Sequence, residues 1–208
     1  MIHLVGLFPE HLNLNGDFGN LAVLQQQLTW RGLDAVTVAA SSAKALTEET
    51  RFVLIGHGST AAWVDIESKM TDMLPTLRSL RDSGVPILAV STGYEFLVRA
   101  GFFKGETTFR SQTRVSKFEI VDFEGREVLG YVNTDVDLPV LQRSGSAIGT
   151  MLHGPVLAKN ADLCEDVLKE ICSLAGLTLP RIQASEKAGL LADLIEAVWK
   201  LESQLANE

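Results

Sequence analysis

The sequence predicts an α/β fold in which helices cover both faces of a mostly parallel central sheet, followed by a C-terminal helical extension. Short apolar runs alternate with helical patterns through roughly the first half of the chain, as in βαβ units. The length of 208 residues and the hydrophobic content of 46% suit one domain with one appended segment. Residues 185–206 carry an apolar stripe at helical spacing, which predicts the extension.

The first half of the chain contains four predicted strands, each a short apolar run that ends at turn residues. They lie at residues 2–8, 35–39, 51–56 and 87–90. Amphipathic spacing predicts helices at residues 21–31, at 66–83, and from the turn at Ser91 through residue 100. Gly32, Gly84 and Pro86 supply the stop signals.

After Gly101 the pattern changes to short strands in which polar and apolar residues alternate. We expect strands at 108–115, 117–122, 127–133 and 147–152, with a hairpin turn at 122–126. Helices follow at 161–175 and 185–206, joined by a linker that contains Pro180. The chain is therefore expected to divide into an α/β domain at 1–176 and a linker with a C-terminal helix at 177–208.

Composition argues against several classes of protein. The net charge is −8, and Lys and Arg form no block. Nucleic-acid binders and membrane-surface proteins need a positive patch, so neither partner is expected. No stretch approaches the roughly 20 apolar residues of a membrane span, and the N-terminal residues do not read as a signal peptide.

The two cysteines indicate a reducing compartment. Cys164 and Cys172 lie eight residues apart on one predicted helix, about 12 Å along its axis, which is too far for a disulfide. We therefore expect a cytoplasmic protein with reduced, buried thiols. No Cys or His cluster has metal-ligand spacing, and neither a metal nor a cofactor is expected.

Three strand ends carry residues that suit acyl transfer: Gly56-His57-Gly58, Ser91-Thr92-Gly93 and His153-Gly154-Pro155. Sites in open α/β sheets form at the C-terminal ends of strands, so these segments converge if their strands are neighbours. Together they would supply a nucleophile, an imidazole base and backbone N–H groups for an oxyanion.

Each segment also has a purely structural interpretation. Serine is a favoured N-cap residue, and Ser91 precedes a helix. His153 fits a loop histidine, and Gly56-His57-Gly58 fits an ordinary strand-to-helix turn. The GxSxG pattern is not met because Ala89 stands where its first glycine is expected, which weakens the α/β-hydrolase interpretation.

Four motifs carry a resemblance to a known family. GTMLHGPVLAKN at 149–160 is similar to the segment GTYLHGPLLPKN, NGDFGNL at 15–21 to YGDRGN, WRGL at 30–33 to WRGI, and LAVSTGYEFL at 88–97 to LAICGGYQLLG. Over about residues 2–176 the chain resembles the class I glutamine amidotransferases of the CobB/CobQ-like branch. Within that branch it is most similar to the GatD-type glutaminase subunit of lipid II isoglutaminyl synthase.

The resemblance implies a flavodoxin-like fold and a role for each matching residue. It makes Ser91 the nucleophile position, His153 the base and Asp17 the group that orients the imidazole. It implies that Gly56, Gly58 and Thr92 form the oxyanion hole. It also implies that Arg114 binds the α-carboxylate of glutamine. An ordinary turn residue remains an alternative for Asp17, and a solvated strand charge for Arg114.

The departures from the family bear on activity. Ser91 replaces the family's cysteine, Thr92 its following glycine and Glu95 its glutamine, while GHGST replaces GGGQD and YVNT replaces FENH. A thiol has a pKa near 8.5 and can form a thiolate beside a histidinium, whereas serine needs a base placed for proton transfer during attack. Glutamine hydrolysis by the chain as written should therefore be low or absent. An engineered Cys-to-Ser replacement and a natural loss both remain open.

Three functions follow from these features. The first is a glutaminase subunit that releases ammonia from glutamine for a separate ATP-dependent Mur-ligase-like synthetase in peptidoglycan precursor (lipid II) amidation. A partner is required because the chain is short and has no GxxxxGK[ST] phosphate loop. The second is a catalytically inactive amidotransferase-like protein with a binding or regulatory role. The third is a serine hydrolase that uses Ser91, His153 and Asp17.

Overall fold

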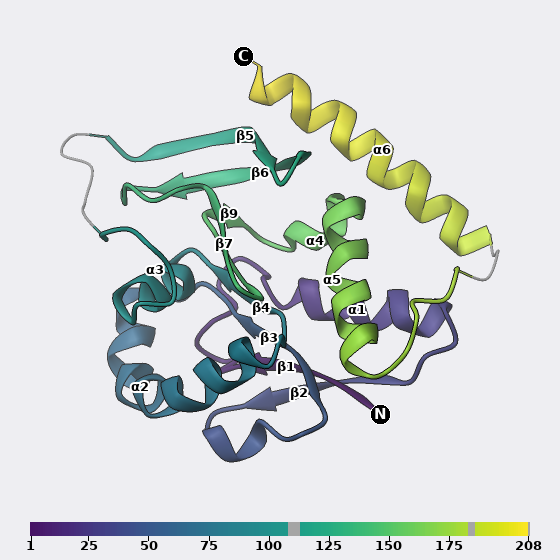
Figure 1. The fold of residues 1–208 in the computed structure, drawn as a ribbon. Coiled ribbons are helices and arrows are strands. Elements are labelled where there is room, and N and C mark those ends of the chain that lie inside the picture. Colours follow the sequence, from purple (N-terminus) through teal and green to yellow (C-terminus); the bar gives the residue numbers. More distant parts are fainter. Residues whose placement is uncertain (108–112, 183–185, 208) are drawn as a thin grey trace.

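A six-stranded sheet forms the centre of the protein (Figure 1). The computed structural model describes residues 1–107, 113–182 and 186–207. In spatial order the strands are β2 (Ala35–Ala40), β1 (Ile2–Leu7), β3 (Thr50–Ile55), β4 (Ile87–Val90), β8 (Ala147–Thr150) and β7 (Leu141–Ser144). All neighbours are parallel except β7, which runs antiparallel to β8. The five parallel strands have the flavodoxin-like order 2-1-3-4-5, as predicted.

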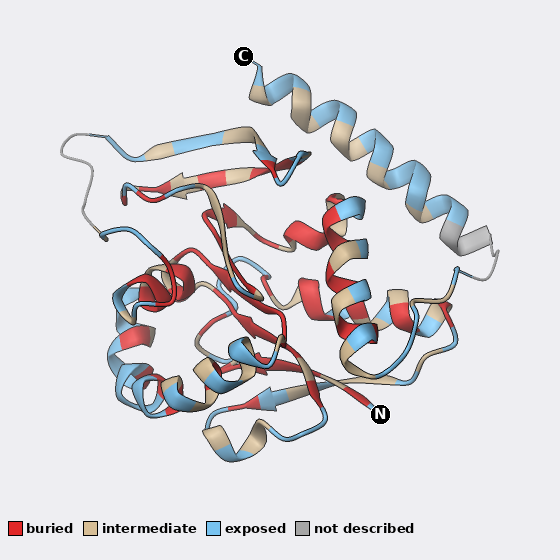
Figure 2. Cartoon of the chain, in the orientation of Figure 1, coloured by how far each residue is buried: buried red, intermediate tan, exposed pale blue. Residues whose placement is uncertain are grey.

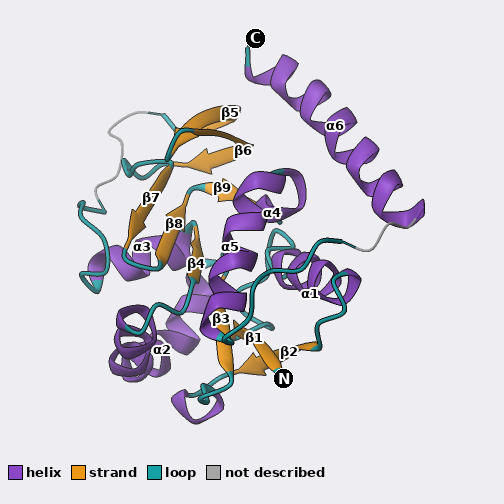
Figure 3. Cartoon of the chain, turned by 45° about the vertical axis from the view of Figure 1, so that its right-hand side comes forward, coloured by secondary structure: helices purple, strands orange, loops and turns teal. Residues whose placement is uncertain are grey.

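Helices cover both faces of this sheet. Figures 1 and 3 show α1 (Gly19–Trp30) and α5 (Ala161–Leu174) on one side, and α2 (Thr60–Asp82) and α3 (Thr92–Arg99) on the other. A short 3-10 helix, η1 (Ala43–Ala45), precedes β3. Every residue of β4 and β8 is buried, which explains why these strands are continuous apolar runs rather than alternating ones (Figure 2).

A second, antiparallel sheet stands beside the first. It consists of β5 (Val115–Phe123), β6 (Arg126–Thr134) and the two-residue strand β9 (Leu152–His153). Glu124 and Gly125 join β5 to β6 with φ angles of 56° and 78°, the backbone that a two-residue type I′ hairpin requires. The predicted hairpin is therefore confirmed. After β8 the chain changes sheets at Met151, so the strand expected at 147–152 is two strands.

The C-terminal helix α6 (Glu186–Ala206) packs against β5, β6 and α4 (Val156–Lys159). Lys159 forms an ion pair with Glu202 at this contact. Cys164 and Cys172 are both buried and free, as expected. None of the helices within the described ranges is long and apolar enough to cross a membrane.

Other differences from the predicted elements have local causes. Helix α2 starts six residues before the expected position, where the Ser59 hydroxyl accepts a hydrogen bond from Ala62 N–H and caps it. Strand β7 (LQRS) was not predicted because it is polar and lies at the sheet edge. The strand expected at 108–115 lies partly outside the described residues, and its last residue, Val115, begins β5.

Candidate functional site

The three strand ends singled out in the sequence do meet. Strand β4 lies between β3 and β8, so the segments that follow these strands share one edge of the sheet. The Ser91 N–H donates to the Thr150 carbonyl at 2.7 Å, which links the turn after β4 to the end of β8. His57, after β3, and His153, in β9, bring their ring centroids within 4.9 Å.

Ser91 occupies a strained turn between β4 and α3. Its φ of 49° and ψ of −111° form a conformation that residues with a side chain rarely adopt. Such conformations are costly and cluster at functional sites. The Ser91 side chain makes no hydrogen bond to the start of α3, so the helix-cap interpretation is wrong. The turn has the geometry of a strand-to-helix nucleophile position, and the side chain that it carries is almost fully buried.

Both ring nitrogens of His153 already have partners. Its Nε2 lies 3.1 Å from the Asn133 carbonyl oxygen, which can only accept, so Nε2 carries the proton. Its Nδ1 then accepts from the side-chain amide of Asn15. Within the described chain no hydrogen bond joins the imidazole to the Ser91 hydroxyl. His153 thus lies at the site, but in this state it does not act as the base for Ser91.

His57 is a second histidine of the site, and the sequence interpretation missed it. Its ring meets that of His153 edge-to-face at 79°, and its Nδ1 lies 3.2 Å from the Thr92 hydroxyl. Burial, together with the charges of His153 and Arg114, lowers the pKa of His57 to about 4. Burial also lowers the pKa of His153. Both imidazoles are therefore neutral at pH 7. The sequence did contain a sign of this second histidine, because His57 stands where the resembling family has a glycine.

Asp17 contacts the backbone of two strand ends rather than an imidazole. Its carboxylate accepts hydrogen bonds from the N–H groups of His57 at 2.8 Å and Gly154 at 3.1 Å. Burial raises its pKa to about 6, against the opposing effect of these two bonds. The structure therefore gives Asp17 a positioning contact, and the imidazole contact expected from the resemblance is made by Asn15.

Asn20 also joins the NGDFGN motif to the segment that follows His153. Its side-chain oxygen accepts from Leu157 N–H at 2.9 Å, and its amide donates to the Asp17 carbonyl at 2.8 Å. Because Asn15, Asp17 and Asn20 all contact residues 153–157, the NGDFGN motif fixes the segment that carries His153. Two motifs that lie more than 130 residues apart thus form one buried polar network.

The expected oxyanion hole is occupied by a side chain. Gly58 N–H donates to the Thr92 hydroxyl at 3.0 Å, so one of the proposed donors is already satisfied. Gly56 is required by packing, because a Cβ there would lie 2.0 Å from the Leu12 carbonyl oxygen. The hydroxyl introduced at Thr92 therefore competes with any substrate oxyanion for the Gly58 donor.

Arg114 lies at the rim of the site. Its Nε donates to the Asn133 side chain at 2.6 Å, and its charge helps to lower the pKa of both histidines. The guanidinium is about half exposed and close to Asp135. Its donors are thus partly engaged by the protein itself, and a contact to a substrate carboxylate stays a prediction.

A small cavity opens beside the Ser91 turn, between α2 and α3. It has a volume of about 230 Å³, and Thr92, Glu95 and Arg99 contribute to its wall. Burial raises the pKa of Glu95, which stands where the resemblance places a glutamine. No group of three or more His, Cys, Asp or Glu side chains suited to a metal occurs in the part of the chain that the structure describes.

Known proteins resemble this chain in sequence and in fold. No protein-family model matches the chain. The GatD subunit of the glutamine-hydrolyzing lipid II isoglutaminyl synthase of Staphylococcus aureus is 23% identical to this chain over an alignment of 217 positions. The alignment covers 88% of this chain and 89% of that protein.

Solved structures match over a similar span. PurLQS from Thermotoga maritima has a TM-score of 0.53 and 15% identity, with 84% of this chain and 98% of that chain covered. A glutamine amidotransferase has a TM-score of 0.54 and 20% identity, with 81% and 98% covered. The chain has the fold of the class I glutamine amidotransferases. The fold class and the resemblance to GatD are thereby confirmed, and the Ser91 turn lies on an amidotransferase fold.

Proposed function

We propose that the protein is a glutaminase-type subunit that acts with a separate ATP-dependent Mur-ligase-like synthetase in lipid II amidation, with little or no glutamine hydrolysis while Ser91 occupies the nucleophile position. The observation that carries the proposal is the strained turn at Ser91, which has no capping role and ends a strand next to the one that leads to His153. The similarity to GatD over most of both chains supports it. The proposal places the protein in the cytoplasm, with residues 1–176 as the amidotransferase domain.

The reaction would begin with attack by the nucleophile on the side-chain amide carbon of glutamine. The proton of the nucleophile passes to His153 and then to the departing ammonia, and water later hydrolyses the acyl-enzyme. In the tautomer that the structure shows, Nε2 carries a proton and Nδ1 accepts from Asn15, so Nε2 can act as the base only after it leaves the Asn133 carbonyl and the ring proton moves to Nδ1. A thiol eases this demand because it can be ionised before attack, whereas the Ser91 hydroxyl cannot.

A second function, binding without catalysis, is favoured by two contacts. The Thr92 hydroxyl accepts a hydrogen bond from Gly58 N–H, and His153 Nε2–H donates a hydrogen bond to the Asn133 carbonyl. Both contacts satisfy groups that catalysis would need free. In this alternative the amidotransferase fold is kept for recognition of glutamine or of a partner subunit.

Glutamate release from glutamine tests the proposal. The chain as given, Ser91→Cys, Ser91→Ala and the double variant Ser91→Cys/His153→Ala would each be assayed with and without the Mur-ligase-like synthetase. We expect activity only in Ser91→Cys. Inactivity of Ser91→Cys with its partner would refute the glutaminase proposal and leave the binding function.

Two further measurements separate the alternatives. A shift of the melting temperature on addition of glutamine would show that a binding pocket is retained, and no shift would show that it is lost. Acylation of Ser91 by a fluorophosphonate probe is expected only of a serine hydrolase. The engaged nitrogens of His153 predict that no such acylation occurs.

A further inference from the structure

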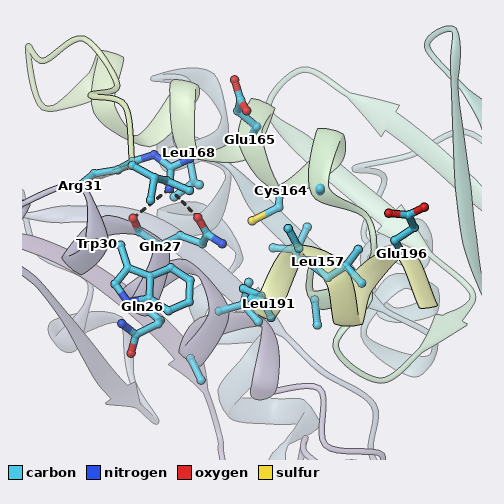
Figure 4. A pocket seen from close by; sticks show the side chains of 17 residues that line it. Gln26, Gln27, Trp30, Arg31, Leu157, Cys164, Glu165, Leu168, Leu191 and Glu196 are labelled. Atoms are coloured by element: carbon cyan, nitrogen blue, oxygen red, sulfur yellow. Dashed lines mark hydrogen bonds between the residues drawn. The ribbon is translucent and has the colours of Figure 1, made fainter. Parts of the chain in front are cut away.

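Two adjoining cavities lie away from the Ser91 turn, one beneath the C-terminal helix and one beside the linker at residues 178–182. The larger has a volume of about 640 Å³ and lies between α1, α5 and α6, with walls that are mainly apolar (Figure 4). The second has a volume of about 480 Å³ and includes Lys169 and Arg181 in its lining. Arg31, Glu165 and Ile182 line both cavities. None of the residues expected to act in glutamine hydrolysis lines either one.

Arg31 is the unusual residue of this region. Its side chain is 9% exposed, and its Nη1 donates to the backbone and side-chain oxygens of Gln27. Its Nε has no hydrogen-bond partner, and no carboxylate within the described chain forms an ion pair with it. A buried guanidinium without a counter-ion is costly, because it loses hydration without gaining a partner. An anion from outside the chain would remove that cost.

The other charges at the junction also favour an anion. Glu165 also lines both cavities, but its ion pair is with Lys169, at 3.2 Å, rather than with Arg31. Arg181 forms no ion pair with the described residues and adds a second positive charge to the smaller cavity. Figure 4 shows Arg31 at one end of the large cavity and Glu196 at the other, so the two ends differ in charge.

The apolar walls of the large cavity indicate that the rest of the ligand is apolar. Trp30, Leu157, Leu168, Leu191 and Ile195 line the large cavity, whose volume falls within the roughly 300–1,000 Å³ of small-molecule sites. We propose that the two cavities form a binding site for an amphipathic anion, with the acidic head group at Arg31 and an alkyl chain in the large cavity under α6. This site is independent of the proposed glutaminase function.

Isothermal titration of the full chain with alkyl anions tests the site. Decanoate and decyl phosphate, below the concentrations at which they form micelles, would be compared with decanol and decyltrimethylammonium. We expect both anions to bind and the two controls to bind at least tenfold more weakly. Affinity should rise about fourfold per added methylene until the chain fills the cavity. The preference between decanoate and decyl phosphate identifies the head group.

Variants place the ligand in the cavity. Arg31→Gln should weaken binding of the anions by about tenfold or more, because it removes a charged hydrogen-bond donor. Ala192→Trp, on the face of α6 that lines the cavity, should weaken binding because the indole occupies the space of the ligand's alkyl chain. Ala197→Trp is the matched control because Ala197 is an exposed residue of the same helix that does not line the cavity.

Three results would overturn the proposal. One is the absence of binding by either anion. Another is equal binding of decyltrimethylammonium and decanoate, which would show an apolar gap without an anion site. The third is an equal loss of binding in Ala192→Trp and Ala197→Trp. If Arg31→Gln lowers the melting temperature, the two tryptophan variants decide the question by themselves.

Discussion

Replacement of Ser91 by glycine should stabilise the protein. Ser91 has a φ of 49° and a ψ of −111°, a conformation that glycine adopts without steric penalty. Strain of this kind costs on the order of 1–3 kcal/mol, and Ser91→Gly would remove most of it. The greater freedom of glycine in the unfolded chain offsets about 0.4–1 kcal/mol of that gain. The net expectation is an increase of about 1 kcal/mol in the free energy of unfolding.

Urea denaturation followed by tryptophan fluorescence measures this change. For a chain of this size, 1 kcal/mol corresponds to a rise of about 2–4 °C in melting temperature, so a thermal scan gives an independent value. Ser91→Ala is the matched control, since it keeps a Cβ and therefore the strain. It should leave stability within about 0.5 kcal/mol, because the Ser91 hydroxyl caps nothing.

Either of two results would refute this reasoning. A loss of about 1 kcal/mol or more in Ser91→Gly would mean that the turn is not strained. A similar loss in Ser91→Ala would mean that the hydroxyl makes a stabilising hydrogen bond, as a cap does. A more stable Ser91→Gly would show that stability is given up at the proposed nucleophile position.

Three further predictions concern groups around the site. Thr92→Gly in a Ser91→Cys background should free the Gly58 N–H and raise kcat for glutamine hydrolysis by about 10²–10³-fold, while Thr92→Ser should give no gain. Asn160→Ala should cost about 2–4 kcal/mol in urea denaturation, because the buried amide holds both backbone groups of Leu129; a loss under about 1 kcal/mol would contradict this role. Burial raises the pKa of Asp17 from its ordinary value of 3.8 to about 6, so the folded state binds the proton more tightly than the unfolded chain does. Stability relative to Asp17→Asn should therefore rise as pH falls from about 6 toward 4, and a pH-independent difference would argue against this burial.

The parallel sheet could be predicted because its strands are distinctive. Strand β4 is a continuous apolar run closed by a turn, and such runs are typical of strands buried on both faces. The convergence of the ends of β3, β4 and β8 was expected only if those strands were neighbours, and the strand order shows that they are. Strand β7 carries no such pattern, because an edge strand does not need one to stay in the sheet.

The contacts within the site could not be predicted in the same way. Residue type does not reveal whether a carboxylate accepts from a backbone N–H or from an imidazole, and Asp17 does the former. His57 was passed over because the glycines on either side of it matched an expected turn. Its importance depends on the packing of two rings from β9 and the loop after β3, which only the three-dimensional structure brings together.

His153, the proposed base, belongs to the smaller sheet rather than to the central one. His153 pairs with Tyr131 of β6, and β6 belongs to the hairpin on which α6 packs. The nucleophile turn, by contrast, is anchored in the central sheet through Thr150. The separation between Ser91 and His153 is therefore set by how two sheets are oriented.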